Sequence, residues 1–168
     1  MMFDIHDSKE NNQERFVLGS SGTNKLFAFG VNPSKANKDK SDTTITKVGR
    51  FSTHLKCDGF VMPNIYTQRA TNPHKLHTNP DGNLVGRNKK VICSQIQNES
   101  QSQIWAARGD LICSRDYLWD CLSRIVEELN QFDLIWKHCG EPTKLGHPRH
   151  PSRLAYKEEF SNSTFSSI

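Results

Sequence analysis

Short apolar segments alternate between two patterns along the central part of the chain, from residue 25 to residue 136. One pattern is a run of strand length bounded by Gly, Pro or Asn, and the other repeats apolar residues at helical spacing. Parallel strands need a long crossover connection, which a helix usually provides. The alternation therefore predicts an α/β fold: a three-layer α/β/α sandwich with a mostly parallel central sheet of about four strands, plus an N-terminal β-hairpin strand.

Individual elements follow from local signals. Two apolar runs, residues 15–18 and 25–29, flank a turn rich in Gly, Ser and Asn, and they predict the hairpin. Asp42 stands where a helix N-cap is expected, ahead of a helical pattern that ends near Asp58. The clearest amphipathic pattern predicts a helix over residues 117–129. The remaining predicted elements are strands at 59–65, 103–107 and 132–136 and a helix at 84–96.

The length of 168 residues fits one domain, and a chain of this size can bury a substantial core. Polar residues dominate the beginning of the chain, and Ser is abundant at its end. We therefore expect a flexible N-terminus at 1–14, a single α/β domain at 15–156 and a flexible Ser-rich tail at 157–168.

The composition predicts an intracellular protein. The five Cys residues are widely spaced and include no C-x-x-C pair, so we expect buried, reduced thiols. No apolar run approaches the roughly 18 residues of a membrane span, and the N-terminus lacks the basic and apolar blocks of a signal peptide. We expect a cytoplasmic monomer with no membrane partner. The net charge of +4 permits binding to a polyanion but does not require it.

Polar sequences follow three predicted strands, at the positions where open α/β sheets bind ligands. The first begins at Gly30, which lets the backbone approach a ligand, while Pro33 stiffens the turn. Asn32 and Ser34 offer an amide and a hydroxyl, and Lys35 beside them can contact a phosphate. A plain strand-to-helix loop is an equally good interpretation of this segment.

The second polar sequence begins at Asn64, whose amide offers the donor and the acceptor that match the edge of a nucleobase. Arg69 follows closely and can bind a phosphate or a carboxylate through two N–H groups. The simpler alternatives are that Asn64 forms a turn and that Arg69 is an ordinary surface residue.

The third polar sequence, residues 146–153, places two His, two Pro and two Arg within eight residues. His147 and His150 can move protons or stabilise developing negative charge near neutral pH. Arg149, Ser152 and Arg153 suit phosphate oxygens. A basic loop that binds nothing is the alternative.

A metal site is the competing interpretation of this region. His138, Cys139, His147 and His150 fall within thirteen residues and are of metal-ligand types. The chain has no second Cys pair, no His-Glu-x-x-His motif and no Asp-rich signature that would complete a coordination set. We therefore expect no metal and no other cofactor.

Taken together, these landmarks resemble a bacterial and phage family known only as a domain of unknown function, DUF1643. The resemblance covers about residues 15 to 154 and includes Asn-Pro-Ser-Lys-Ala at 32–36, Asp-Thr-Thr-Ile at 42–45, Asn64, Arg-Ala-Thr at 69–71 and His-Pro-Arg-His-Pro at 147–151. More distantly, the chain resembles the uracil-DNA glycosylase superfamily, through Gly-Val-Asn-Pro at 30–33, Met-Pro-Asn at 62–64 and His-Pro-Ser at 150–152. This second resemblance implies a uracil-DNA glycosylase-like fold.

The resemblance to the glycosylases also implies roles for individual residues. Asn32 would position a water molecule, and Asn64 would bind an extruded base. His150 or His147 would stabilise the negative charge of the departing base. The base site would also include Gly30, Pro33 and Ser34, and the phosphate contacts would come from Lys35, Arg69, Arg149, Ser152 and Arg153.

Asn32 stands where the most active glycosylases have Asp, so the resemblance implies a slower or narrower enzyme. The expected function is a nucleobase-directed hydrolase, DNA glycosylase-like, that acts on an unusual or modified base. Two alternatives keep the same pocket: a protein that binds or processes a free nucleotide or nucleoside, and a non-catalytic DNA-binding or interaction protein. The expected partner is therefore DNA or a nucleotide.

Overall fold

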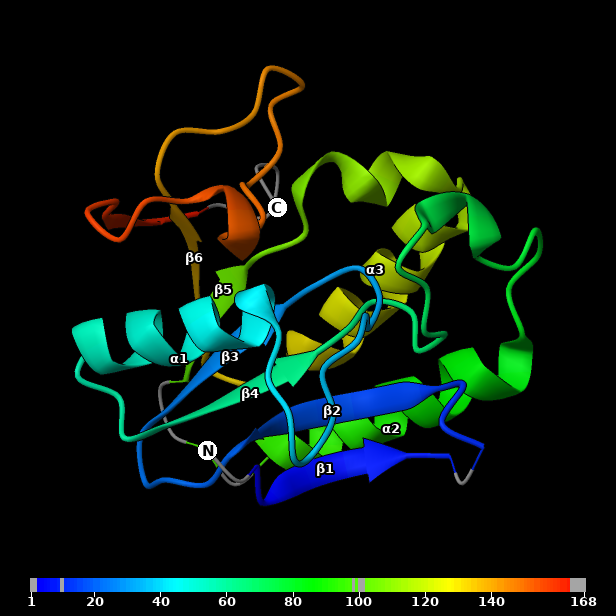
Figure 1. Cartoon of the computed structure of the whole chain (residues 1–168), viewed down its shortest axis with the longest axis horizontal. Coiled ribbons are helices and arrows are strands. Elements are labelled where there is room, and N and C mark those ends of the chain that lie inside the picture. Colours follow the sequence, from blue (N-terminus) through cyan, green and yellow to red (C-terminus); the bar gives the residue numbers. More distant parts are fainter. Residues whose placement is uncertain (1–2, 10, 98, 100–101, 164–168) are drawn as a thin grey trace.

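The computed structural model describes residues 3–9, 11–97, 99 and 102–163, and Figure 1 shows one sheet with helices on both of its faces. The helices are α1 (Thr43–His54), α2 (Gly82–Ile96) and α3 (Tyr117–Leu129), with short 3₁₀ helices η1 (Pro73–Lys75), η2 (Gly109–Ser114) and η3 (Pro151–Arg153). The strands are β1 (Ile5–Ser8), β2 (Arg15–Ser20), β3 (Lys25–Phe29), β4 (Gly59–Pro63), β5 (Gln103–Ala106), β6 (Ile135–Cys139) and β7 (Phe160–Asn162).

Among the described residues the sheet has seven strands in the order β1-β2-β4-β3-β5-β6-β7. The central strands β4, β3, β5 and β6 are parallel to one another, which confirms the predicted α/β class and its parallel centre. Strands β1, β2 and β7 are antiparallel to their neighbours. The sheet is therefore mixed and larger than predicted, because segments near both ends of the chain add edge strands.

The predicted hairpin between β2 and β3 is wrong. β2 pairs with β4, which lies between it and β3, and the actual hairpin partner of β2 is β1. Asp58, just before β4, accepts hydrogen bonds from the backbone N–H groups of Thr23 and Asn24 at 3.0 and 2.8 Å. These bonds attach the connection between β2 and β3 to the beginning of β4. The Gly/Ser/Asn turn therefore crosses the beginning of β4 and joins two strands that are not neighbours in the sheet.

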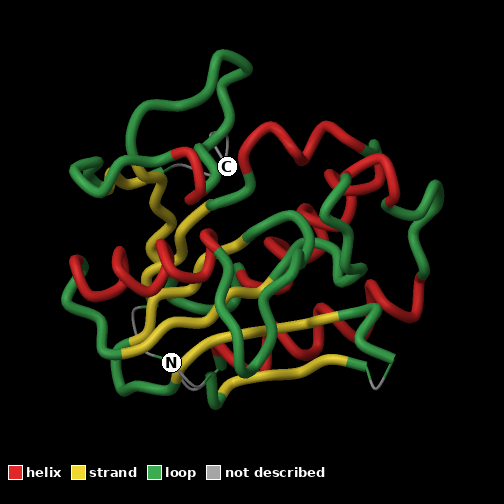
Figure 2. Tube along the Cα trace, viewed as in Figure 1, coloured by secondary structure: helices red, strands yellow, loops and turns green. Residues whose placement is uncertain are grey.

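The core lies in two layers, one on each face of the sheet, beneath the helices that Figure 2 shows on the two faces. On one face, Ile45, Val48 and Phe51 of α1 pack with strand residues that include Leu26 and Trp105. On the other face, α2 and α3 pack on the alternate strand residues, among them Phe27 and Ile104. Because successive strand residues point to opposite faces, both layers draw on the same strands.

Helix boundaries follow the capping signals in the sequence. The side chain of Asp42 accepts from Ile45 N–H at 3.0 Å, as predicted, and that of Asp81 caps α2 in the same way. The last parallel strand begins at Ile135 rather than at residue 132, because Phe132 N–H bonds to Leu129 C=O and continues the turn that ends α3.

The two terminal segments also contribute to the fold. Residues 1–14, predicted to be flexible, contain β1 and the buried side chain of Phe3, and residues 157–168 contain β7. Residues 1–2 and 164–168 of these segments lie outside the described residues. Within the described part of the chain, no helix combines the length and the hydropathy of a membrane span.

Candidate functional site

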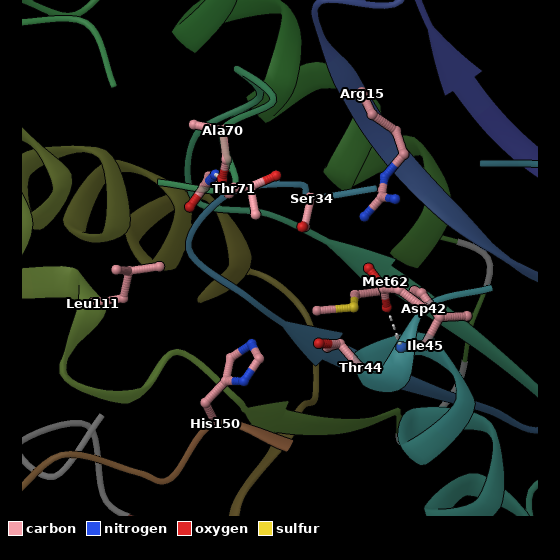
Figure 3. A pocket seen from close by; sticks show the side chains of 11 residues that line it. Arg15, Ser34, Asp42, Thr44, Ile45, Met62, Ala70, Thr71, Leu111 and His150 are labelled. Carbon is pink, nitrogen blue, oxygen red and sulfur yellow. Dashed lines mark hydrogen bonds between the residues drawn. The ribbon is translucent and has the colours of Figure 1, made fainter. Parts of the chain in front are cut away.

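A cavity of about 180 Å³ lies beyond the carboxyl ends of β3 and β4 and against the first turn of α1. Residues 30–36, here called the Asn32 loop, contribute Asn32 and Ser34 to its wall. Residues 146–153, here called the His150 loop, contribute His150. Figure 3 shows how the side chains of Ser34 and His150 and those of Arg15, Asp42, Thr44, Thr71 and Leu111 surround the space. The fold thus brings two sequence-predicted loops together.

Gly30 connects β3 to the Asn32 loop at a point of close packing. Its N–H donates to Pro63 C=O at 3.2 Å, and its own C=O accepts from Ile65 N–H at 2.9 Å. A Cβ atom at this position would lie 2.8 Å from Met62 Cε and 3.0 Å from Asn64 Oδ1. A side chain at residue 30 would therefore require the ends of the Met62 and Asn64 side chains to move.

Asn32 has its amide nitrogen committed to the protein. Nδ2 donates to Ala70 C=O at 2.8 Å and to Pro33 C=O at 3.1 Å. These bonds fix the orientation of the side chain, and they leave Oδ1 as the atom that can serve a ligand, as an acceptor only. The chemistry that Asn32 can offer is to accept a hydrogen bond from water or from a base.

Arg15 and Arg69 hold the end of the same loop. Both donate through Nη1 to Ala36 C=O at 2.8 Å, and Arg69 Nη1 also donates to Ser34 C=O at 2.7 Å. Burial, more than the neighbouring charge of Arg69, lowers the pKa of Arg15 to about 10, so Arg15 stays charged at neutral pH. Arg69 was predicted as a phosphate ligand, and in the structure it contacts the loop backbone.

His150 lines the cavity wall with its ring held by Ser152. Its Nδ1 lies 2.8 Å from Ser152 Oγ and accepts from Ser152 N–H at 3.3 Å, so the ring proton belongs on Nε2. Burial lowers the pKa of His150 to about 4, against an opposing effect of the Asp42 carboxylate. At neutral pH this side chain is an uncharged N–H donor at the cavity wall.

Gly109 packs directly against His150 and helps to fix its position. Its φ of +61° favours glycine, and a Cβ there would lie 3.0 Å from His150 Cβ. Gly109 N–H also donates to Pro148 C=O at 2.9 Å, which attaches the His150 loop to the segment after β5. A residue larger than glycine at 109 would be strained by this φ and would press against His150 Cβ.

The other predicted histidine, His147, does not line the cavity. Its Nε2 lies 3.3 Å from Cys113 Sγ, and its ring lies 5.5 Å from that of Trp119. Burial and the charge of Arg108 lower the pKa of His147. The two histidines of the same motif therefore have different surroundings, and His150 is the one placed to meet a ligand.

Three further predicted residues do not line the cavity. Asn64 is completely buried beneath Gly30, and neither its Oδ1 nor its Nδ2 has a partner among the described residues. Lys35 is exposed and does not line the cavity. Pro33 is buried, and its C=O accepts from Ala70 N–H at 3.1 Å, which makes it part of the loop's framework.

A larger groove of about 770 Å³ continues from the cavity and shares Thr71, Leu111 and His150 with it. Arg149 and Arg153 line this groove, together with the basic residues Arg108 and Lys144 and the hydroxyl of Ser152. Asp110 is the single acidic residue among those that line it. The groove is therefore positively charged and suits a chain of phosphates.

The proposed metal ligands are dispersed. His138 Nδ1 lies 2.7 Å from Ser163 Oγ, and the Cys139 thiol is buried beside Glu158 C=O. In the part of the chain that the structure describes, no group of three His, Cys, Asp or Glu side chains is placed to hold a metal ion.

Sequence reasoning missed Arg15, Thr44, Thr71 and Leu111 as cavity residues. Arg15 had a detectable signal, since it is a charged residue that directly precedes the apolar run Phe-Val-Leu of β2. The others are contributed by loops and helix ends whose meeting point depends on the tertiary fold, and nothing local distinguishes them.

Comparison with known proteins identifies one family model, which matches residues 15–152 and is described as a protein of unknown function (DUF1643). No curated protein and no solved structure matches the chain. The match covers the Asn32 loop and the His150 loop up to Ser152.

Proposed function

The chain belongs to the DUF1643 family, whose description assigns no activity, and we propose from its site that the protein is a nucleobase-directed hydrolase. In this proposal it is DNA glycosylase-like and cleaves the N-glycosidic bond of an unusual or modified base. The observation that supports this most is His150, an uncharged N–H donor at the wall of a small cavity that opens into a basic groove.

The size of the cavity favours a single base over a larger ligand. Pockets for drug-sized molecules have volumes of about 300–1,000 Å³. At about 180 Å³, this cavity suits a smaller flat group, and its wall combines apolar Ile45, Met62 and Leu111 with polar side chains. A base extruded from DNA needs this combination, because its faces are apolar and its edge is polar.

In the proposed reaction, each of the two loops contributes one side chain. Water oxygen attacks the sugar C1′ carbon while the bond from C1′ to the base nitrogen breaks, and the base leaves with the electron pair. His150 Nε2–H donates to the base oxygen on which negative charge develops, and Asn32 Oδ1 accepts a hydrogen bond from the attacking water. One proton of that water ends on the departing base. A neutral histidine suits this role because its Nε2–H can donate a hydrogen bond at neutral pH, whereas a doubly protonated ring would require an acidic solution.

The groove supplies the contacts to the DNA backbone. Arg149, Arg153 and Ser152 would bind phosphates next to the extruded nucleotide and fix its position relative to the cavity. Such contacts carry no sequence information, so the choice of base would depend on the cavity. The parallel order of β4, β3, β5 and β6, with the site beyond their carboxyl ends, is consistent with a uracil-DNA glycosylase-like architecture.

The experiment is mass spectrometry of bases released from unmodified and modified DNA by the native protein and by the Asn32→Ala and His150→Ala variants. We expect release of one class of base by the native protein and its loss in both variants. If no DNA yields a base and mononucleotides bind in the cavity, the protein is a nucleotide-binding protein. If DNA binds and neither result is seen, it is a non-catalytic DNA-binding protein.

A further inference from the structure

Two arginine side chains meet beneath the Asn32 loop. Arg15, at the start of β2, is 2% exposed, and Arg69 reaches the same place from the loop after β4. Both bond to the same carbonyl oxygen, that of Ala36, at 2.8 Å. Two positive charges are therefore held within a few ångströms of each other in the interior.

Neither arginine forms an ion pair with a carboxylate in the described part of the chain. Buried Nε of Arg15, and buried Nε and Nη2 of Arg69, also have no hydrogen-bond partner there. Asp42 is the acidic residue that acts on both charges, but its Oδ1 already caps α1 by accepting from Ile45 N–H. His6 on β1 lies nearby, and burial, followed by the charge of Arg15, lowers its pKa, so His6 adds no positive charge at neutral pH.

This arrangement is costly for the protein alone. A buried charge is destabilising unless it is paired, and like charges side by side add to the cost. A carbonyl oxygen satisfies one N–H of each group but supplies no negative charge. Sites that bind an anion accept such a cost, because the ligand completes the pairing when it arrives.

The cavity gives a ligand access to this charge. Arg15 lines the cavity, and Figure 3 shows its guanidinium and the ring of His150 both pointing into the space. The hydroxyl groups of Ser34 and Thr44 line the cavity as well and can donate to an oxyanion. Arg69 does not line the cavity, so it acts as a second charge behind Arg15.

We propose that Arg15, supported by Arg69, binds an oxyanion group of the ligand, a carboxylate or a phosphate, inside the cavity. The site is separate from the basic groove, where Arg149 and Arg153 face solvent. Its assignment to a nucleobase ligand depends on the proposed function. If that function holds, the substrate is a base with an acidic substituent or a nucleotide whose phosphate enters the cavity.

Calorimetric titration with matched ligand pairs tests the proposal. The pairs are 5-carboxyuracil against uracil, which tests a carboxylate on the base, and deoxyuridine monophosphate against deoxyuridine, which tests a phosphate. We expect the native protein to bind the anionic member of one pair at least tenfold more tightly, and the pair identifies the source of the oxyanion. Equal affinities within both pairs would overturn the proposal.

Variants then test whether Arg15 and Arg69 cause the preference for the anionic ligand. Arg15→Gln and Arg69→Gln should each reduce it at least tenfold, whereas Arg124→Gln, an exposed substitution on α3, should leave it unchanged. If Arg15→Gln does not fold, the native protein still gives an answer by NMR, because the Arg15 Nε–H resonance should shift with inorganic phosphate and not with chloride at equal ionic strength. An unshifted resonance would contradict the proposal. Base release from DNA is measured separately, so failure of the hydrolase proposal leaves this result interpretable.

Discussion

The two loops that form the site use their polar groups in opposite ways. In the Asn32 loop, backbone oxygens accept from the side chains of Asn32, Arg15 and Arg69, so polar side chains support the backbone. In the His150 loop, backbone N–H groups supply most of this support, since Gly109 N–H donates to Pro148 C=O and Arg153 N–H to His150 C=O, and Lys47 Nζ adds one side-chain bond to Ser152 C=O. Of its side chains, His150 lines the cavity and Arg149, Ser152 and Arg153 line the groove, although Arg149 Nε also donates to Glu141 C=O at 2.6 Å.

This difference distinguishes the side chains that fix the shape of the site from those that are placed to act on a ligand. A side chain committed to the backbone fixes a shape, and its removal affects stability together with activity. A side chain held only by a neighbour on its own loop, as His150 is by Ser152, can be removed with a larger effect on activity than on the fold. We therefore expect the His150 loop to dominate catalysis and the Asn32 loop to dominate the architecture of the site.

The largest expected effect is on catalysis by His150→Ala. Loss of one donor to a developing negative charge lowers the rate by about 10²–10³-fold, and we expect base release to fall by that factor. Quantitative mass spectrometry of released bases measures it. His147→Ala is the matched control, because His147 contacts Cys113 outside the cavity, and it should retain activity within a few-fold. Equal losses in the two variants would remove the distinction between the histidines.

The depressed pKa of His150 predicts a pH dependence of stability. Burial lowers this pKa from 6.5 to about 4, so the unfolded chain takes up a proton below pH 6.5 while the folded protein does not. Stability that is present above pH 6.5 is therefore lost as the pH falls toward 4, by about 3 kcal/mol for a shift of this size.

Urea denaturation at pH 7 and pH 4.5 measures this loss in the native protein and in His150→Gln. The variant should lose less stability over the same range, since it lacks this ionisable group. The pKa of His6 and that of His147 are also lowered, and both residues remain in the variant, so the difference between the proteins isolates His150. Parallel losses in the two proteins would show that His150 is not held neutral.

The sequence predicted those features of the site that depend on local signals. Asp42 was placed as an N-cap because a cap contacts residues only three positions away, and the His150 loop was recognised by its density of His, Pro and Arg. The partner of β2 could not be predicted, because strand pairing depends on distant segments. Arg15 had a local signal beside the apolar run of β2, but its role was missed because the carbonyl oxygen that it bonds, that of Ala36, is 21 residues away in the sequence.

The next largest effect concerns the architecture of the Asn32 loop. Asn32→Asp replaces the Nδ2 donor by a carboxylate oxygen, which faces the carbonyl oxygens of Ala70 and Pro33. An unsatisfied and repulsive interaction of this kind costs about 1–3 kcal/mol, and chemical denaturation at pH 7 should show that loss.

The exposed substitution Asn79→Asp is the control, and it should change the free energy of unfolding by less than about 0.5 kcal/mol. A variant Asn32→Asp that is as stable as the native protein would mean that the amide nitrogen does not support the loop. Asn32 would then belong with His150 as a side chain free for the ligand.

The smallest expected effect concerns the groove side of the His150 loop. Arg149→Ala and Arg153→Ala should each weaken DNA binding without preference for sequence, because arginine–phosphate bonds position DNA and do not specify it. The plot of log K against log salt concentration should become shallower by about 0.9 for each phosphate that the variant no longer neutralises, as measured by fluorescence anisotropy over a range of NaCl. Arg124→Ala removes an equal charge from the exposed surface of α3 and should leave the slope unchanged. If it changes the slope as much as the groove variants do, DNA binding follows net charge, and the His150 loop has no particular part in holding the backbone.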